Sequence, residues 1–159
     1  MRVLGVDPGY DRVGLAGMEY NNGKEQLLFS TCLETNKSDH LHNRLQQVGQ
    51  TISQLIAKHE VDTLGIETLF FNKNVKTAMS VAEARGIIIY CALQAGCTIY
   101  EFSPQAIKIA TTGYGNSDKT AVTTMIHQLI ANVRPDALDD EYDAIAVGIT
   151  CLAHHGRTS

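Results

Sequence analysis

Several features that would place a chain of 159 residues in a familiar class are missing from this sequence. No apolar run approaches the roughly 20 residues that a membrane-spanning helix needs. The chain passes from Met1-Arg2 straight into a predicted strand, so we expect no signal peptide. No C-x-x-C or H-E-x-x-H pattern occurs. We therefore expect the four cysteines to be buried or incidental thiols of a cytoplasmic protein, not disulfide or zinc ligands.

Positive charge is also scarce. The net charge is −4 and the pI is near 5.8, which argues mildly against a nucleic-acid partner, because phosphate binding needs positive charge. The distribution matters more than the total. Residues 70–119 contain five bases and three acids and so carry +2, which leaves −6 for the remainder. Five acids fall between Asp136 and Asp143 alone, so the chain has two local fields of opposite sign.

The composition predicts one folded domain over residues 1–159. Hydrophobic residues make up 44% of the chain, which supplies a core at this length, and no linker, repeat or low-complexity tract interrupts it. The patterning predicts strands at about 2–7, 12–20, 26–34, 61–67 and 98–102, and helices at about 38–59, 75–95, from 104, from 118 to 130, and from 139. This βββαβαβααα order predicts an α/β fold: a mixed five-stranded sheet, its first three strands antiparallel, with helices on both faces.

Two of the predicted strands end on a carboxylate. The stretch VLGVDPG is almost unbrokenly apolar up to Asp7, after which Pro8-Gly9 ends the strand, and VDTLGIE ends in the same manner on Glu67. Each acid has an ordinary explanation, Asp7 as a turn residue and Glu67 as a salt-bridged strand end. If the two strands are parallel neighbours, however, both carboxylates emerge at one edge of the sheet, where ligand sites of α/β proteins form.

The last helix adds two more acids. In D-D-E-Y-D-A, Asp140 and Asp143 are three residues apart and share a helix face. Ordinary first-turn capping is the alternative explanation. Four ordinary explanations would need four separate partners, whereas one or two divalent cations would satisfy all four carboxylates. Oxygen-only ligands favour Mg²⁺ or Mn²⁺ over zinc, and two such ions can activate a water and stabilise the leaving oxygen of a phosphodiester.

Five short motifs carry a family resemblance. They are G-V-D-P-G (5–9), I-E-T-L-F-F-N-K-N-V-K-T-A (66–78), A-R-G (84–86), G-Y-G-N-S-D-K (113–119) and D-E-Y-D-A-I-A (140–146). In this order and spacing, over nearly the whole chain, they resemble the RuvC family of Holliday-junction resolvases, within the RNase H-like superfamily. The resemblance implies an RNase H-like fold with Asp7, Glu67, Asp140 and Asp143 as catalytic metal ligands, together with Lys119 as a further catalytic residue.

The same resemblance implies a Mg²⁺-dependent endonuclease, with Mn²⁺ able to substitute and two ions in each active site. A homodimer would nick four-way junction DNA symmetrically and leave 5′-phosphate and 3′-hydroxyl ends, in homologous recombination and DNA repair. A branch-migration helicase complex is a further partner that the resemblance leaves open. The chain departs from the family at Glu83, where Gln usually precedes A-R-G, in its short segment after the last helix, and in its negative net charge.

The expected DNA contacts lie in the positively charged segment. Phe70 matches the family's aromatic residue that stacks on junction bases, the alternative being that Phe70 and Phe71 are both buried. Lys73 and Asn74 belong to the same loop and are expected to meet DNA. Lys108 and Lys119 match lysines near the scissile phosphate, and Lys119 follows a predicted helix cap, where phosphate binds readily. Without the family, an ordinary exposed lysine explains Lys119 equally well.

Other functions fit the sequence less well. G-Y-G-N-S-D-K-T (113–120) nearly matches an NTP-binding P-loop, but Asp118 replaces the second glycine and would repel phosphate, so we reject that function. An ATPase of the actin and sugar-kinase type would need two such domains. The alternatives that stay open are another RNase H-like nuclease, acting on RNA/DNA hybrid or structured RNA, and a non-catalytic junction-binding module. Retention of four acids argues against the module, because they would only repel phosphates.

Overall fold

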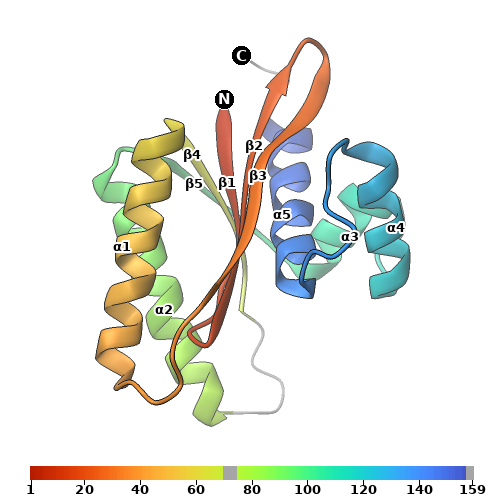
Figure 1. The fold of residues 1–159 in the computed structure, drawn as a ribbon. Helices are drawn as coiled ribbons and strands as arrows, with labels where there is room; N and C mark the ends of the chain where they lie inside the picture. Colours follow the sequence, from red (N-terminus) through yellow and green to blue (C-terminus); the bar gives the residue numbers. More distant parts are fainter. Residues whose placement is uncertain (70–74, 157–159) are drawn as a thin grey trace.

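The computed structural model describes residues 1–69 and 75–156. A central sheet separates two groups of helices, with α1 and α2 on one face and α3, α4 and α5 on the other (Figure 1). The elements are β1 (Arg2–Asp7), β2 (Arg12–Asn21), β3 (Lys24–Glu34), α1 (Leu41–His59), β4 (Thr63–Glu67), α2 (Val75–Gln94), β5 (Thr98–Phe102), α3 (Pro104–Thr112), α4 (Lys119–Leu129) and α5 (Asp139–His155). In the part of the chain described, no helix is long and apolar enough to cross a membrane.

The sheet has the predicted topology. Its strand order is β3-β2-β1-β4-β5, with antiparallel pairing of β1–β2 and β2–β3 and parallel pairing of β1–β4 and β4–β5. The β2–β3 hairpin turns at Asn22 and Gly23, both with positive φ, as two-residue hairpin turns require. The predicted parallel neighbours β1 and β4 are therefore confirmed, and both end at the same edge of the sheet.

One helix begins later than predicted. We expected a helix from residue 38, but α1 begins at Leu41. The backbone N–H groups of Ser38 and Asp39 bond to the side-chain and backbone oxygens of Asn36, each at 3.0 Å. This local turn competes with the helix for the same donors and delays its start.

Residues of β1 alternate between the two layers. Leu4 and Val6 join the core beneath α1 and α2, whereas Val3 joins the core beneath α5. By the period-two rule, Gly5 and Asp7 lie on the same side as Val3. In β4, Leu64 and Ile66 likewise face α1 and α2, so Glu67 faces the α5 side together with Asp7.

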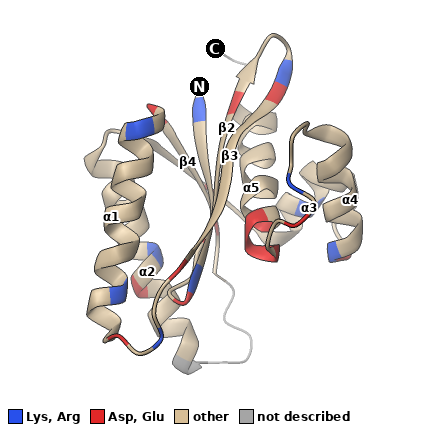
Figure 2. Ribbon diagram, viewed as in Figure 1, with Lys and Arg blue, Asp and Glu red and all other residues tan. Residues whose placement is uncertain are grey.

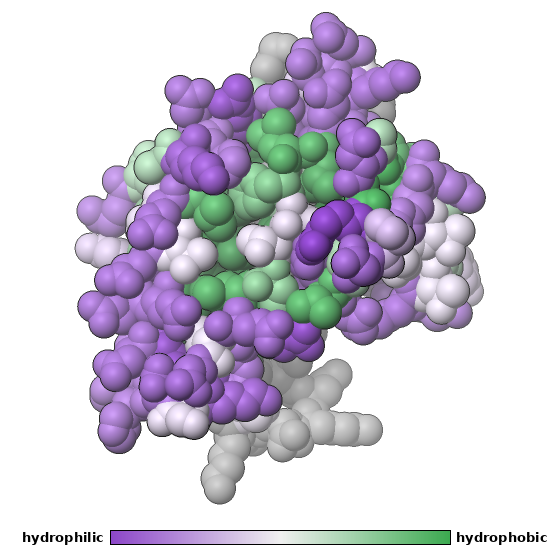
Figure 3. Space-filling view, viewed as in Figure 1, coloured by the Kyte–Doolittle hydropathy of each residue, from purple (hydrophilic) through white to green (hydrophobic). Residues whose placement is uncertain are grey.

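The edge strand β3 carries an apolar surface. Figure 3 shows apolar residues at the centre of the view, over the sheet edge that β3 forms, with hydrophilic residues around them. The β2–β3 register slips between Gly17 and Met18, so Phe29 and Leu27 are paired and Leu28 has no strand partner. Leu28 is the exposed residue of this bulge. Bulges of this kind increase strand twist and protect an edge from pairing with other chains.

Candidate metal-binding active site

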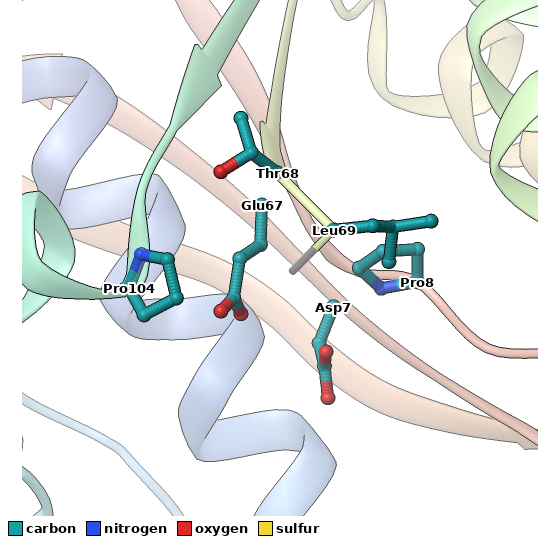
Figure 4. Close-up of a pocket in the computed structure, with 6 residues that line it drawn as sticks. All are labelled: Asp7, Pro8, Glu67, Thr68, Leu69 and Pro104. Carbon is teal, nitrogen blue, oxygen red and sulfur yellow. The ribbon is translucent and has the colours of Figure 1, made fainter. Parts of the chain in front are cut away.

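Two carboxylates project from the ends of neighbouring parallel strands. Asp7 ends β1 and Glu67 ends β4, and both belong to the lining of one pocket of about 260 Å³. Figure 4 shows the two side chains pointing to the same side, between Pro8 and Pro104. Neither proline can extend a strand ladder, so the backbone leaves the sheet here and opens the pocket.

Glycines bring the third and fourth carboxylates to this edge. A Cβ added at Gly14 would lie 1.8 Å from the backbone oxygen of Asp140, and one at Gly5 would lie 2.3 Å from that of Ala144. Only glycine at these positions lets α5 lie directly on β1 and β2. Asp140 and Asp143 occupy the first turns of that helix, which Figure 2 shows as an acidic band. The predicted convergence therefore has a packing cause.

The electrostatics show how close the four acids are. Burial, and then the charges of Asp143, Glu67 and Asp140, raise the pKa of Asp7 from 3.8 to about 7. Burial and the charge of Asp143 also raise the pKa of Glu67. Burial raises the pKa of Asp143, which Lys119 partly offsets. Within the described residues, no base lies within ion-pair distance of the carboxylates of Asp7 or Glu67. Lys119 lowers the pKa of both acids only in part, so burial and the neighbouring carboxylates dominate.

Two bases compensate the acids of α5. Lys119 Nζ lies 3.4 Å from Asp143 Oδ2 and 3.9 Å from Asp139 Oδ2. Arg12, at the start of β2, places Nε 3.3 Å from Asp140 Oδ2. Sequence reasoning identified Lys119 but missed Arg12, because nothing in the sequence shows that the start of β2 lies beneath the start of α5. Lys108 lies near Glu67, since its charge lowers the pKa of that carboxyl.

These ion pairs bear on whether the site fits a metal ion. As the side chains are placed, no three His, Cys, Asp or Glu residues of the described part surround one point closely enough to hold a metal. Two of the four acids are turned to Arg12 and Lys119 instead. The donor set itself fits a hard divalent cation, because it consists of carboxylate oxygens. Burial and then the charges of three neighbouring acids raise the pKa of Asp7, and a cation bound at these carboxylates would oppose that rise.

Arg85, on α2, fixes the backbone at Glu67. Its Nε donates to the backbone oxygen of Glu67 at 3.1 Å, and its guanidinium also bonds to the Glu101 carboxylate on β5. Thr68 continues the pairing of β4 with β5 through its N–H bond to the Phe102 oxygen at 2.9 Å. A second pocket of about 320 Å³ adjoins here, lined by Thr68, Leu69, Ala82, Arg85 and Glu101. The backbone that carries Glu67 is therefore fixed by α2 and β5.

A buried carboxylate between the two acids of α5 fixes the first turn of the helix. Glu141 is 2% exposed and accepts from Arg134 at 2.9 and 3.2 Å and from Ser30 Oγ at 2.8 Å. Tyr142 is also buried, and its hydroxyl donates to the Arg134 backbone oxygen at 3.1 Å. Because these residues lie between Asp140 and Asp143 in the helix, anchoring them holds the two acids on the face that meets the sheet.

The loop before Lys119 is a helix-capping loop. Asp118 caps α4 by accepting from the Ala121 N–H at 2.8 Å, and helix α3 precedes the loop instead of a strand. Both observations agree with the rejection of a P-loop. Lys119 is the first residue of α4, so its ammonium lies beside a helix N-terminus. The predicted DNA contacts Phe70, Lys73 and Asn74 lie outside the described residues.

Comparison with known proteins gives one consistent result. The family model for crossover junction endodeoxyribonuclease RuvC matches residues 3–151. Curated proteins of that name from Clostridioides difficile and Thermosipho melanesiensis are 36% and 38% identical to this chain, each over 99% of it and over 92% and 99% of their own lengths.

Solved structures share the fold. The chain superimposes on "T. thermophilus RuvC in complex with Holliday junction substrate" with a TM-score of 0.90 at 24% identity, covering 99% of this chain and 95% of that one. The yeast mitochondrial Holliday junction resolvase Ydc2 gives a TM-score of 0.70 at 12% identity, covering 97% and 81%. The mixed five-stranded α/β sheet expected from the sequence is confirmed at this level.

Proposed function

We propose that this chain, which belongs to the RuvC family of crossover junction endodeoxyribonucleases, resolves four-way DNA junctions by paired phosphodiester hydrolysis. The observation that carries the proposal is the meeting of Asp7, Glu67, Asp140 and Asp143 at one edge of the sheet. A chain that only bound junctions would gain nothing from four carboxylates facing a polyanion. Hydrolysis would leave 5′-phosphate and 3′-hydroxyl ends, which suits a role in recombination and repair in the cytoplasm. We take residues 1–159 to be one nuclease domain.

The proposed cofactor is Mg²⁺, with Mn²⁺ as a substitute and two ions in each active site. Asp7, Glu67, Asp140 and Asp143 would hold the ions, and the charges of the other three acids all act on Asp7. When bound, such ions activate a water and stabilise the leaving oxygen. The chain's own part is to hold four carboxylates on rigid elements and to keep Lys119 at the helix N-terminus beside them.

The proposed DNA contacts extend outward from the acids. Lys108 and Lys119 are close enough to shift the pKa of Glu67, so they reach the region in which the scissile phosphate would lie. Phe70, Lys73 and Asn74 come three to seven residues after the end of β4 in the sequence and are proposed to contact the junction. Stacking of one base on an aromatic residue such as Phe70 contributes about 1–3 kcal/mol.

A homodimer would match a twofold-symmetric junction, and we propose that α2 supplies its interface. Met79, Tyr90 and Leu93 are exposed apolar residues at helical spacing. Gly86 lies in the same stripe, and a Cβ there would meet no described atom within 4 Å, so a second helix could approach closely. Arg85, which bonds to the Glu67 backbone, is on this helix too. The proposed partner of this stripe is the same stripe of a second copy.

The test uses a labelled synthetic four-way junction, with linear duplex and RNA/DNA hybrid of the same sequence as controls, each in Mg²⁺ and in EDTA. Paired symmetric nicks on the junction only, and only with Mg²⁺, would support the proposal. Cutting of the hybrid instead would indicate an RNase H-type substrate. Metal-independent tight binding without cutting, on junctions of several core sequences, would indicate a binding module and refute the enzyme proposal.

A further inference from the structure

Asp140 and Asp143, the two acids of α5 that are expected to bind metal, each form an ion pair with a basic side chain. Asp143 pairs with Lys119 on α4, and Asp140 pairs with Arg12 on β2. Lys119 matches a residue implied by the family motif. Arg12 belongs to none of the family motifs, yet its guanidinium lies on an acid of the same cluster.

The balance of charges shows what these bases do. At a pH at which all four acids are ionised, these acids and the two bases that pair with them leave an excess of two negative charges, which repels DNA. Two divalent ions would turn this into an excess of two positive charges. If a metal ion bound the Asp140 carboxylate, Arg12 would lose this ion-pair partner and its guanidinium could pair with another anion, such as a phosphate.

The surroundings of Arg12 keep it at the rim of the site. Its side chain is 43% exposed, so it can reach solvent without unfolding anything. Glu34 lies directly opposite it across the β2–β3 ladder, and Cys32 lies beside it with Sγ 3.9 Å from Asp140 Oδ2. The turn before Arg12 is fixed by buried Arg44, which bonds to Asp11 and to the backbone oxygen of Tyr10. These bonds hold the backbone of the turn, while the partly exposed Arg12 side chain can turn from Asp140 to another partner.

We propose that Arg12 exchanges partners during the reaction cycle. It neutralises Asp140 in the metal-free protein, and when a divalent ion binds there it releases Asp140 and contacts a phosphate of the DNA. The proposal rests on the proposed function, because it takes the four acids to be metal ligands and DNA to be the substrate. Arginine suits both roles, since its planar fork pairs equally well with carboxylate and phosphate.

The exchange predicts that one substitution of Arg12 will raise the affinity for Mn²⁺ and lower the affinity for junction DNA. Arg12→Gln removes a competitor for Asp140, so Mn²⁺ should bind about 2- to 5-fold more tightly, the range expected when a partly exposed ion pair is removed. The same variant can no longer neutralise that phosphate, so junction binding in Ca²⁺ should weaken. The slope of its salt dependence should fall by about one for each phosphate that is no longer neutralised. In EDTA, junction binding should weaken less than in Ca²⁺, because Arg12 is then paired with Asp140 and contacts no phosphate.

The experiment measures Mn²⁺ affinity by electron paramagnetic resonance and binding of a fluorescent junction across a salt series, in EDTA and in Ca²⁺, before any cutting is detected. Arg2→Gln is the matched control: Arg2 is 40% exposed and pairs with Glu19 and Glu60, but it begins β1 at the end away from Asp7. Arg2→Gln should change neither the Mn²⁺ affinity nor the junction affinity. Arg12→Lys should keep part of the salt slope, because it keeps the charge without the fork.

Three results would overturn the exchange. They are parallel weakening of Mn²⁺ and junction binding in Arg12→Gln, no change in either, or equal weakening of junction binding in EDTA and Ca²⁺. Parallel weakening would mean that Arg12 only supports the structure. The measurements on the wild-type protein test the proposed function separately. If the wild-type protein neither binds Mn²⁺ nor cuts the junction, the proposed function is refuted, and the proposed exchange of Arg12 partners is refuted as well.

Discussion

Replacing Asp7 by asparagine should stabilise the protein while abolishing its activity. The pKa of Asp7 is raised from 3.8 to about 7, first by burial and then by Asp143, Glu67 and Asp140. The folded state therefore keeps a proton that the unfolded state gives up between pH values of about 4 and 7, and stability falls as the pH rises through this window. A pKa difference of this size corresponds to about 4 kcal/mol, which is the cost of ionising Asp7 in the metal-free protein at pH 8.

The assay is urea unfolding of the wild-type protein and Asp7→Asn in EDTA, at pH 8 and near pH 4. At pH 8 the variant should be more stable, by as much as about 4 kcal/mol, because the amide carries no charge. Near pH 4 the difference should nearly vanish, since Asp7 is then protonated in the folded protein. The exposed acid Asp39 supplies the control, and Asp39→Asn should show no comparable gain at pH 8.

Added Mg²⁺ completes the test. The wild-type protein at pH 8 should gain stability with Mg²⁺ concentration, by about 2.7 kcal/mol at one hundred times the dissociation constant, and Asp7→Asn should not. The variant should not cut junctions. The reasoning is refuted if Asp7→Asn is no more stable than the wild-type protein in EDTA at pH 8, or if it keeps the response to Mg²⁺.

Three further predictions concern residues around the site. Arg85→Ala should weaken Mn²⁺ binding about 10- to 100-fold in calorimetry by freeing the Glu67 backbone, and unchanged affinity would exclude this support. Gly14→Ala should cost about 1–3 kcal/mol in urea unfolding, because its Cβ would collide with the Asp140 backbone oxygen; full stability would show that α5 does not need this close approach. Tyr90→Asp should convert a dimer into a monomer in analytical ultracentrifugation, and a persisting dimer would place the interface elsewhere.

The sequence was most informative where the pattern is local. The apolar run up to Asp7 and its counterpart up to Glu67 predicted two strand ends, and the three-residue spacing of Asp140 and Asp143 predicted a shared helix face. The order of elements then predicted parallel neighbours, which the pairing of β1 with β4 confirms. The predictions of the strand ends and of the shared helix face depend only on the residue periodicity within one strand or one helix.

What the sequence did not predict depends on contacts between distant elements. The pairing of Arg12 with Asp140 requires the start of β2 to lie beneath the start of α5, which follows from the contact of Gly14 with the helix backbone. The burial of Glu141 requires partners from both β3 and the loop before α5. The only local signal was Gly14 within a strand. A glycine there indicates that another backbone segment approaches closely, but it does not identify that segment.

The same geometry links folding to activity. Asp7 and Glu67 face the α5 acids because the strands alternate and because glycines let the helix lie on the sheet. That packing buries Asp7 and brings like charges near it, and both effects, burial first, raise its pKa and destabilise the metal-free protein above that pKa. On the proposal that the carboxylates bind cations, those cations would offset this repulsion, and part of the affinity for metal would come from repulsion already present in the fold. A variant that relieves the repulsion without removing Asp7, such as Asp143→Asn, should therefore bind metal more weakly for two reasons, the removal of a ligand and the relief of that repulsion.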